Sequence, residues 1–268
     1  MPTHQQPLSG GRLAQLAHDL TVPEQQLLRE LGTVHLATTN HLSRLAFGWY
    51  GWPTARRLGH RHVQRLVRFG LIQRYVNRSR DRKVGPAGYV LALTADGAAL
   101  NGSAARRQQR RTWEPSEAFL AHRLAITELY VQLVEEHRVG GPTVSRFEAE
   151  PDCWRFYLGG YGERSSVKPD AYLRLELDRR ELSWFVEIDR GTEAPRHIAA
   201  KCAVYAAYEL ADVEQRQRGV FPGILFIVPT ERRAQSIQAV IDRQPPDSRD
   251  LFRVATEPDA LTALGTVW

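Results

Sequence analysis

Cysteine is scarce in this chain of 268 residues, which contains only Cys153 and Cys202. Two cysteines so far apart form neither a disulfide framework nor a zinc-ligand spacing, so they indicate a reducing cytoplasm. Long apolar runs are also lacking, because no segment approaches the roughly 18 apolar residues of a membrane-spanning helix. The first residues, MPTHQQPLSGG, have no apolar core and are not typical of a signal peptide. We therefore expect a cytoplasmic protein with no membrane partner.

Acidic residues are scarce in the first part of the chain. Residues 1–111 contain 17 Lys and Arg against 5 Asp and Glu, whereas residues 112–268 contain 19 against 25. Such an asymmetry indicates that the first part meets a polyanion and that the second part has another role. The predicted organisation, in chain order, is a flexible N-terminus over 1–20, a first domain over 21–103, a linker over 104–115 and a second domain over 116–268.

The first domain is predicted to be a winged helix-turn-helix. Apolar spacing and capping residues predict three helices, then two strands around a basic loop, then a short helix capped by Thr94. The helices are expected at 22–31, from Thr38 or Thr39 onward, and at 54–69, and the strands at 71–76 and 89–94. A helix followed by a hairpin with a basic tip is the arrangement of a DNA-reading helix and its wing.

Basic residues dominate the third helix and the wing. Ten Lys and Arg against one acid, Asp81, lie between Thr54 and Lys83. Unbroken positive charge repels itself and suits the phosphate backbone of double-stranded DNA, and arginine also reads guanine edges. The alternative is that these residues only solubilise the domain or bind an acidic protein. The predicted DNA-binding residues are Arg56, Arg57, Arg61, Arg65, Arg68, Arg74, Arg78, Arg80, Arg82 and Lys83.

Trp49 and Trp52 flank the turn before the third helix. We expect both side chains to pack in the core or within the turn rather than to stack on bases.

The second domain is predicted to be α/β (α+β), with a mixed sheet. A long helix at 117–137 precedes several strands, and a second helix then leads to the apolar strand GILFIV at 223–228. This order of a helix, several strands, a helix and a strand is typical of helices packed on a mixed sheet. The other expected strands are 143–149, 153–158, 168–177, 182–189 and 251–255, and the other helices are 195–210 and 231–242.

Three carboxylates form the candidate metal site of this domain. Asp170 opens one predicted strand, and Glu187 and Asp189 share a face at the end of the next. Clustered carboxylates repel one another unless a cation neutralises them, and Mg²⁺ or Mn²⁺ prefers such oxygen ligands. A bound metal would polarise a phosphodiester and activate water. The alternative is a salt-bridged or solvated sheet edge, with Arg190, Arg196 and Lys201 as partners.

The same residues resemble the PD-(D/E)XK nuclease superfamily. Pro169-Asp170 matches the PD element, and Glu187-Ile188-Asp189 stands in the place of (D/E)-x-K. The resemblance implies Asp170, Glu187, Asp189 and Lys201 as catalytic residues, with Lys201 replacing the lysine that is absent at Asp189. Glu128 is a loose match to an acid that some members carry on the preceding helix.

Over roughly residues 22–230 the chain more closely resembles the replication-relaxation family of plasmid and mobile-element proteins. The residues that carry this resemblance are LTADG at 93–97, EIDRGTE at 187–193 and KCAVY at 201–205. The family implies a bacterial, nucleoid- or plasmid-associated protein with a role in replication, DNA relaxation or conjugation. The expected partners are double-stranded DNA and a relaxase or replication initiator, and a homodimer is left open.

Three functions remain open at this point. The first is a DNA-binding accessory protein of relaxosome type with a degenerate nuclease-like domain. The second is an active Mg²⁺-dependent endonuclease or nickase, and the third is a transcriptional regulator whose second domain binds a ligand or partner. Glu187 and Asp189 without an adjacent lysine favour the first.

Overall fold

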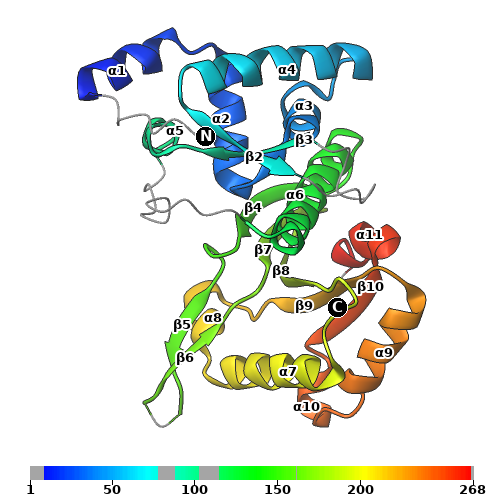
Figure 1. Cartoon of the computed structure of the whole chain (residues 1–268). Helices are drawn as coiled ribbons and strands as arrows, with labels where there is room; N and C mark the ends of the chain where they lie inside the picture. The colour runs from blue at the N-terminus through cyan, green and yellow to red at the C-terminus, as the bar shows by residue number, and fades with distance from the viewer. Residues whose placement is uncertain (1–8, 78–87, 103–114, 161, 267–268) are drawn as a thin grey trace. The chain divides into compact units, whose positions relative to one another are not determined.

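The computed structural model describes residues 9–77, 88–102, 115–160 and 162–266 (Figure 1). It divides into two compact units, Met1–Val131 and Gln132–Trp268, and the boundary lies within helix α6 (Glu117–Arg138). Nearly all of the predicted linker at 104–115 lies outside the described residues. Among the residues that the structure describes, no helix is long and apolar enough to cross a membrane.

Apart from α1 and β1, the helices and strands of unit 1 lie close to the positions that the sequence predicts. Thr38 caps α3 and Thr94 caps α5, each by accepting a hydrogen bond from a backbone amide of the first turn. Before α6, its elements are α1 (Gly10–Asp19), α2 (Val22–Val34), β1 (Ala37–Thr38), α3 (Thr39–Phe47), α4 (Trp52–Arg68), β2 (Ile72–Asn77), β3 (Gly88–Leu93) and α5 (Ala95–Leu100).

Residues 10–19 are not the flexible segment that the sequence analysis assigns to them, because they form α1. Ser9 caps this helix by accepting a hydrogen bond from the amide of Arg12. Leu16, only 2% exposed, anchors the helix in the core of unit 1. Leu13, Leu16 and Leu20 repeat at helical spacing, but the segment is short and otherwise polar, and the sequence prediction overlooked this pattern.

The strands of unit 1 form one antiparallel sheet in the order β1-β3-β2. Strands β2 and β3 pair from Ile72 opposite Leu93 to Asn77 opposite Gly88, which makes them the two arms of a hairpin. The predicted tip of the wing, with Arg78, Arg80, Arg82 and Lys83, lies outside the described residues.

Helix α4 buries one narrow stripe, flanked by half-buried positions, and leaves its opposite face to solvent. Ala55, Gly59, Val63 and Leu66 are buried at helical spacing. The backbone of α3 approaches closely at Gly59, where an added Cβ would overlap the hydroxyl oxygen of Ser43 and lie 3.1 Å from its Cα. Glycine is therefore required for the close packing of α3 on α4.

Replacement of Gly59 with alanine tests this contact. Glycine to alanine normally stabilises a helix interior by about 1 kcal/mol. Here we expect a net loss of about 1–3 kcal/mol in the free energy of unfolding, because the methyl group overpacks against Ser43. Urea unfolding measures the change, and Gly10→Ala is the control, since nothing described lies within 4 Å of its added Cβ. A stabilised Gly59→Ala variant would contradict the close packing.

Unit 2 contains the predicted mixed sheet and four short elements that the sequence analysis did not anticipate: β6, α8, α10 and α11. The helix at 195–210 and the strands at 143–149 and 223–228 have the predicted bounds. After α6, its elements are β4 (Thr143–Ala149), β5 (Arg155–Leu158), β6 (Arg164–Val167), β7 (Ala171–Leu177), β8 (Arg180–Ile188), α7 (Pro195–Leu210), α8 (Val213–Arg218), β9 (Gly223–Val228), α9 (Glu231–Ile241), α10 (Pro246–Arg249), β10 (Phe252–Thr256), a 3-10 turn (Glu257–Asp259) and α11 (Ala260–Leu264).

The main sheet of unit 2 has the strand order β10-β9-β8-β7-β4. Strands β4, β7 and β8 pair antiparallel, whereas β8, β9 and β10 pair parallel. A parallel pair needs a long crossover, and α7 lies in the one between β8 and β9. The mixed α/β fold class is therefore confirmed. Strands β5 and β6 form a separate antiparallel pair.

Helices α7 and α9 cover one face of this sheet. Aromatic and aliphatic side chains of β7, β8, β9 and β10 pack there against both helices in one continuous cluster. Phe185 of β8 contacts the rings of Tyr205 and Tyr208 on α7 at centroid distances of 5.9 and 6.4 Å. The opposite face includes Trp184, whose indole donates a hydrogen bond to the carbonyl of Leu264 in α11. Strand β8 is thus buried on both faces, and the polar residue near its end, Glu187, lies in the interior.

Candidate functional site

A buried carboxylate, that of Glu187, lies near the end of β8. Its side chain points toward α7, because it shares a face with Phe185. Tyr205 donates a hydrogen bond to one carboxylate oxygen at 2.6 Å, and the ammonium group of Lys201 donates to the other at 2.8 Å. Lys201 and Tyr205 are four residues apart and so lie on one face of the helix. The structure therefore brings together two of the predicted catalytic residues, Glu187 and Lys201.

Burial and neighbouring charges change the proton affinities of this group. Burial and, to a lesser extent, the nearby Asp170 carboxylate raise the pKa of Glu187, while Lys201 and the hydrogen bond from Tyr205 lower it, and the net result is a pKa of about 7. Burial lowers the pKa of Lys201, but Glu187 and Glu193 outweigh this effect and hold it above its usual range. Burial also raises the pKa of Tyr205, so the phenol stays protonated and donates its hydrogen bond.

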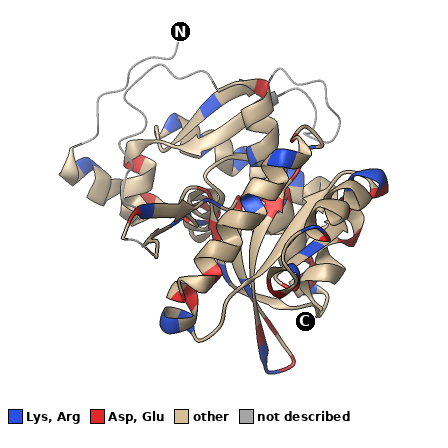
Figure 2. Ribbon diagram, turned by 90° about the horizontal axis from the view of Figure 1, so that it is seen from below, with Lys and Arg blue, Asp and Glu red and all other residues tan. Residues whose placement is uncertain are grey.

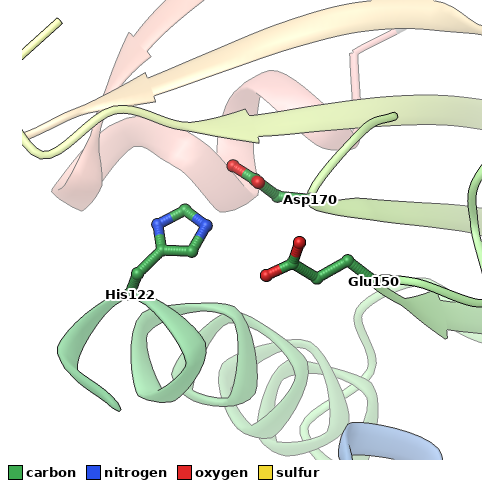
Figure 3. A group of neighbouring side chains, drawn as sticks. All are labelled: His122, Glu150 and Asp170. Atoms are coloured by element: carbon green, nitrogen blue, oxygen red, sulfur yellow. The ribbon is translucent and has the colours of Figure 1, made fainter. Parts of the chain in front are cut away.

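Asp170 precedes β7, directly across from Glu187 when the strand register is continued by one residue. Its carboxylate accepts a hydrogen bond from the amide of Ile188 at 2.6 Å. The end of β4 contributes Glu150, whose backbone amide donates to the carbonyl of Asp170. The Asp170 and Glu150 carboxylates have oxygens within 4.8 Å of each other (Figure 3). Sequence reasoning missed Glu150, because nothing in its pattern predicts that the strand ends would meet.

Asp189 has a different environment from Glu187 and Asp170. The guanidinium group of Arg233 on α9 binds both of its carboxylate oxygens, at 2.5 and 3.0 Å. Arg233 also donates to the carbonyl of Glu193, whose carboxylate accepts a hydrogen bond from Lys201 at 2.8 Å. The loop over 187–193 is thus fixed by two cations, and Gly191, at a φ of 79°, makes its turn.

The three predicted metal ligands therefore do not share one environment. Arg233 donates a hydrogen bond to each oxygen of Asp189 and balances its charge. Asp170 and Glu150 offer carboxylate oxygens within 4.8 Å of each other, the ligand type that Mg²⁺ and Mn²⁺ prefer. The carboxylates around Asp170 fit such a cation, whereas Asp189 is paired with Arg233 in the structure.

In unit 1, α4 presents a basic surface. Arg56, Arg57, Arg61 and Arg68 are exposed, and the helix contains no Asp or Glu. Figure 2 marks Lys and Arg in blue and Asp and Glu in red along the ribbon.

Arg65, also predicted to bind DNA, is engaged within unit 1. Its guanidinium group lies 3.0 Å from both oxygens of the buried Glu24 on α2, and His62 lies 3.2 Å from the same carboxylate. Burial raises the pKa of Glu24, but hydrogen bonds from Thr21 and His62 and the charge of Arg65 bring it below its usual range. Arg65 thus ties α4 to α2.

The hairpin and the turn before α4 add further exposed groups. Arg74 on β2 lies over the ring of Tyr89 on β3, with 5.2 Å to the centroid. Trp49 and Trp52 are 61% and 47% exposed. The expectation that these tryptophans pack in the core is therefore wrong, although the ring of Trp49 does contact that of Tyr50 within the turn. Apolar composition alone favours burial, but this turn lies where the chain leaves the core between α3 and α4.

Glu128, the loose match to a nuclease helical acid, is paired within unit 1. Arg44 lies 2.7 Å from its carboxylate and His41 lies 3.2 Å from it. Burial raises the pKa of Glu128, but these two partners lower it to about 2. The residue therefore has a structural role in joining α6 to α3.

A family model with the description replication-relaxation matches residues 28–224. The chain belongs to the replication-relaxation family. Membership indicates a role in the replication or relaxation of plasmids or other mobile elements. The match covers most of unit 1 and the part of unit 2 that contains the Glu187 site. A search of curated proteins and a search of solved structures found no match.

The ion pair of Lys201 with Glu187 predicts a pH-dependent stability. The pKa of Glu187 is about 7 in the folded protein and near 4.5 when unfolded, so the free energy of unfolding falls as pH rises from about 4.5 to about 7. Lys201→Met removes the neutralising charge. We expect it to cost about 2 kcal/mol at pH 8 and much less at pH 5, where Glu187 is protonated.

Urea unfolding at pH 5 and at pH 8 measures both values. Lys201→Arg keeps the charge and is the matched control, with a smaller and less pH-dependent loss. Equal losses at both pH values for Lys201→Met would show that the lysine contributes packing and not charge.

Proposed function

We propose that this protein is a double-stranded-DNA-binding accessory factor of plasmid or mobile-element replication or relaxation. The main support for this proposal is the row of exposed arginines on α4, a helix that contains no acidic residue. These arginines are Arg56, Arg57, Arg61 and Arg68. Neutralisation of phosphates by such a row releases counterions, and this release favours binding. A helix with side chains is narrow enough to enter the major groove.

The arrangement of unit 1 supports a winged helix-turn-helix as the DNA-binding device. Helices α2, α3 and α4 are followed by the β2–β3 hairpin, and α4 stands in the place of the recognition helix. In this motif, residues near the start of the recognition helix contact base edges. We assign Arg56, Arg57 and Arg61 to the groove, Arg68 to the backbone, and Arg65 to the support of α4 through Glu24.

Unit 2 is proposed to be a nuclease-like domain without an efficient active site. Its helix, antiparallel β4, β7 and β8, crossover helix α7 and parallel β9 have the order that the resemblance to PD-(D/E)XK nucleases implies. The guanidinium group of Arg233 binds the carboxylate of Asp189, the residue that stands where the resemblance implies a catalytic lysine. The outer part of the loop over 187–193, residues 190–193, is then a surface for a relaxase or replication initiator.

Neutralising the exposed arginines should weaken DNA binding. Arg61→Gln combined with Arg57→Gln should lower duplex affinity at least about 10-fold at 100 mM salt. The slope of the logarithm of affinity against the logarithm of salt should become shallower by about 1–2. Fluorescence anisotropy with a labelled duplex measures both quantities.

Arg232→Gln, at an exposed arginine of α9, is the matched control and should leave both quantities unchanged. Arg65→Gln should lower the free energy of unfolding as well as affinity, because it leaves the buried carboxylate of Glu24 without its guanidinium partner. Unchanged duplex binding by the Arg57 and Arg61 variant would contradict the assignment of α4.

A metal-dependent nickase is the second candidate, and the contact of Lys201 with Glu187 favours it. Asp170, with Glu150 or Glu187, would hold Mg²⁺ or Mn²⁺, which would supply charge for the phosphodiester and an activated water. Lys201 would place a positive charge beside them.

Incubation with supercoiled plasmid in Mg²⁺, Mn²⁺ or EDTA tests the nickase. We expect no metal-dependent nicking but a rise in melting temperature with metal concentration, and Asp170→Asn should abolish that rise. Nicking that requires Asp170 and Lys201 would instead establish the second candidate.

A further inference from the structure

Three exposed aromatic side chains lie in the turn between α3 and α4 and at the first residue of α4. Trp49, Tyr50 and Trp52, here named the aromatic turn, are 61%, 49% and 47% exposed. The ring centroids of Trp49 and Tyr50 are 6.4 Å apart. Folded proteins usually bury rings of this size, so neighbouring exposed rings mark a surface that meets another molecule.

The backbone holds the aromatic turn in a defined conformation. The amide of Tyr50 donates to the carbonyl of Phe47 at 3.0 Å, and the amide of Thr54 donates to the carbonyl of Gly51 at 2.9 Å. Beneath it, the ring of Phe47 stacks on His62 of α4 at 5.6 Å. Because the turn is fixed, binding to its rings costs little conformational entropy.

The charge around the aromatic turn selects the class of ligand. Arg56 and Arg57 follow within the first turns of α4, and no acidic residue occurs between Gly48 and Arg68. A cationic surface with exposed rings complements an anionic polymer that carries planar rings. Double-stranded DNA hides the faces of its bases, whereas unpaired DNA exposes them for stacking on aromatic side chains.

We propose that the aromatic turn stacks unpaired DNA bases beside the duplex that α4 holds. This inference rests on the proposed DNA-binding function and specifies its substrate as duplex DNA with an adjoining unpaired segment. Replication requires that the two DNA strands separate, and nicked DNA has a strand end that can unpair. Both processes therefore supply unpaired bases beside a duplex. The duplex contact comes from the α4 arginines, and the preference for opened DNA comes from the rings.

The test compares three DNA probes with the full-length protein at one salt concentration. They are a duplex, the same duplex with an unpaired flank, and the flank as a single strand. We expect the flanked duplex to bind at least about 5-fold more tightly than the plain duplex, because each stacked base contributes measurably. The Trp49→Ala, Trp52→Ala double variant should lose this preference and keep its duplex affinity within about 2-fold.

A spectroscopic readout and a matched control complete the design. 2-Aminopurine in the unpaired flank should lose fluorescence on binding to the wild-type protein and not on binding to the double variant. Phe156→Ala removes another exposed ring, 73% exposed on β5, and should leave all three affinities unchanged. Unaltered thermal unfolding of the variants excludes a folding defect.

The result that overturns the proposal is equal affinity of the wild-type protein for the plain and flanked duplexes. Equal weakening of both by the double variant would also overturn it, because the rings would then contact the duplex. Duplex binding without any preference refutes stacking and leaves the proposed function intact. Failure to bind any of the three probes refutes both.

Discussion

The buried carboxylate of Glu187 is the constraint on which the arrangement of unit 2 depends. A carboxylate that is 3% exposed costs several kcal/mol unless a cation or strong donors accompany it. Lys201 and Tyr205 meet this requirement from α7, and Lys201 continues to Glu193. Arg233 does the same for Asp189 from α9. The two helices are therefore fixed to one end of β8 by charge as well as by apolar packing.

In unit 1 a buried carboxylate is likewise paired with basic side chains from another helix. Glu24, fully buried, joins the first turn of α2 to the second half of α4 through Arg65 and His62. A count of basic residues along the chain cannot separate an arginine that anchors a buried acid from one that faces solvent. The DNA-binding set that the sequence predicts is for this reason larger than the exposed set on α4.

Local patterns predicted most elements, and long-range partners account for the errors. Capping threonines, apolar periodicity and glycines set the bounds of α3, α7 and β9. Asp170 and Glu187 lie at neighbouring strand ends because β7 and β8 follow one another in the chain and pair antiparallel. The partnership of Asp189 with Arg233 spans 44 residues, and Glu150 meets Asp170 through the pairing of β4 and β7. Neither relation leaves a periodic signal in the sequence.

The narrow buried stripe of α4 has a consequence for how this protein could diversify. Ala55, Gly59, Val63 and Leu66 hold the helix in place, and Arg65 secures it to Glu24. The intervening outward positions, 56, 57, 60 and 61, can change identity without disturbing that packing. If α4 contacts DNA as proposed, related chains could acquire new recognition sequences by substitution at a few codons on a constant scaffold. A combinatorial library confined to those four positions would be a direct route to variants with reprogrammed targets.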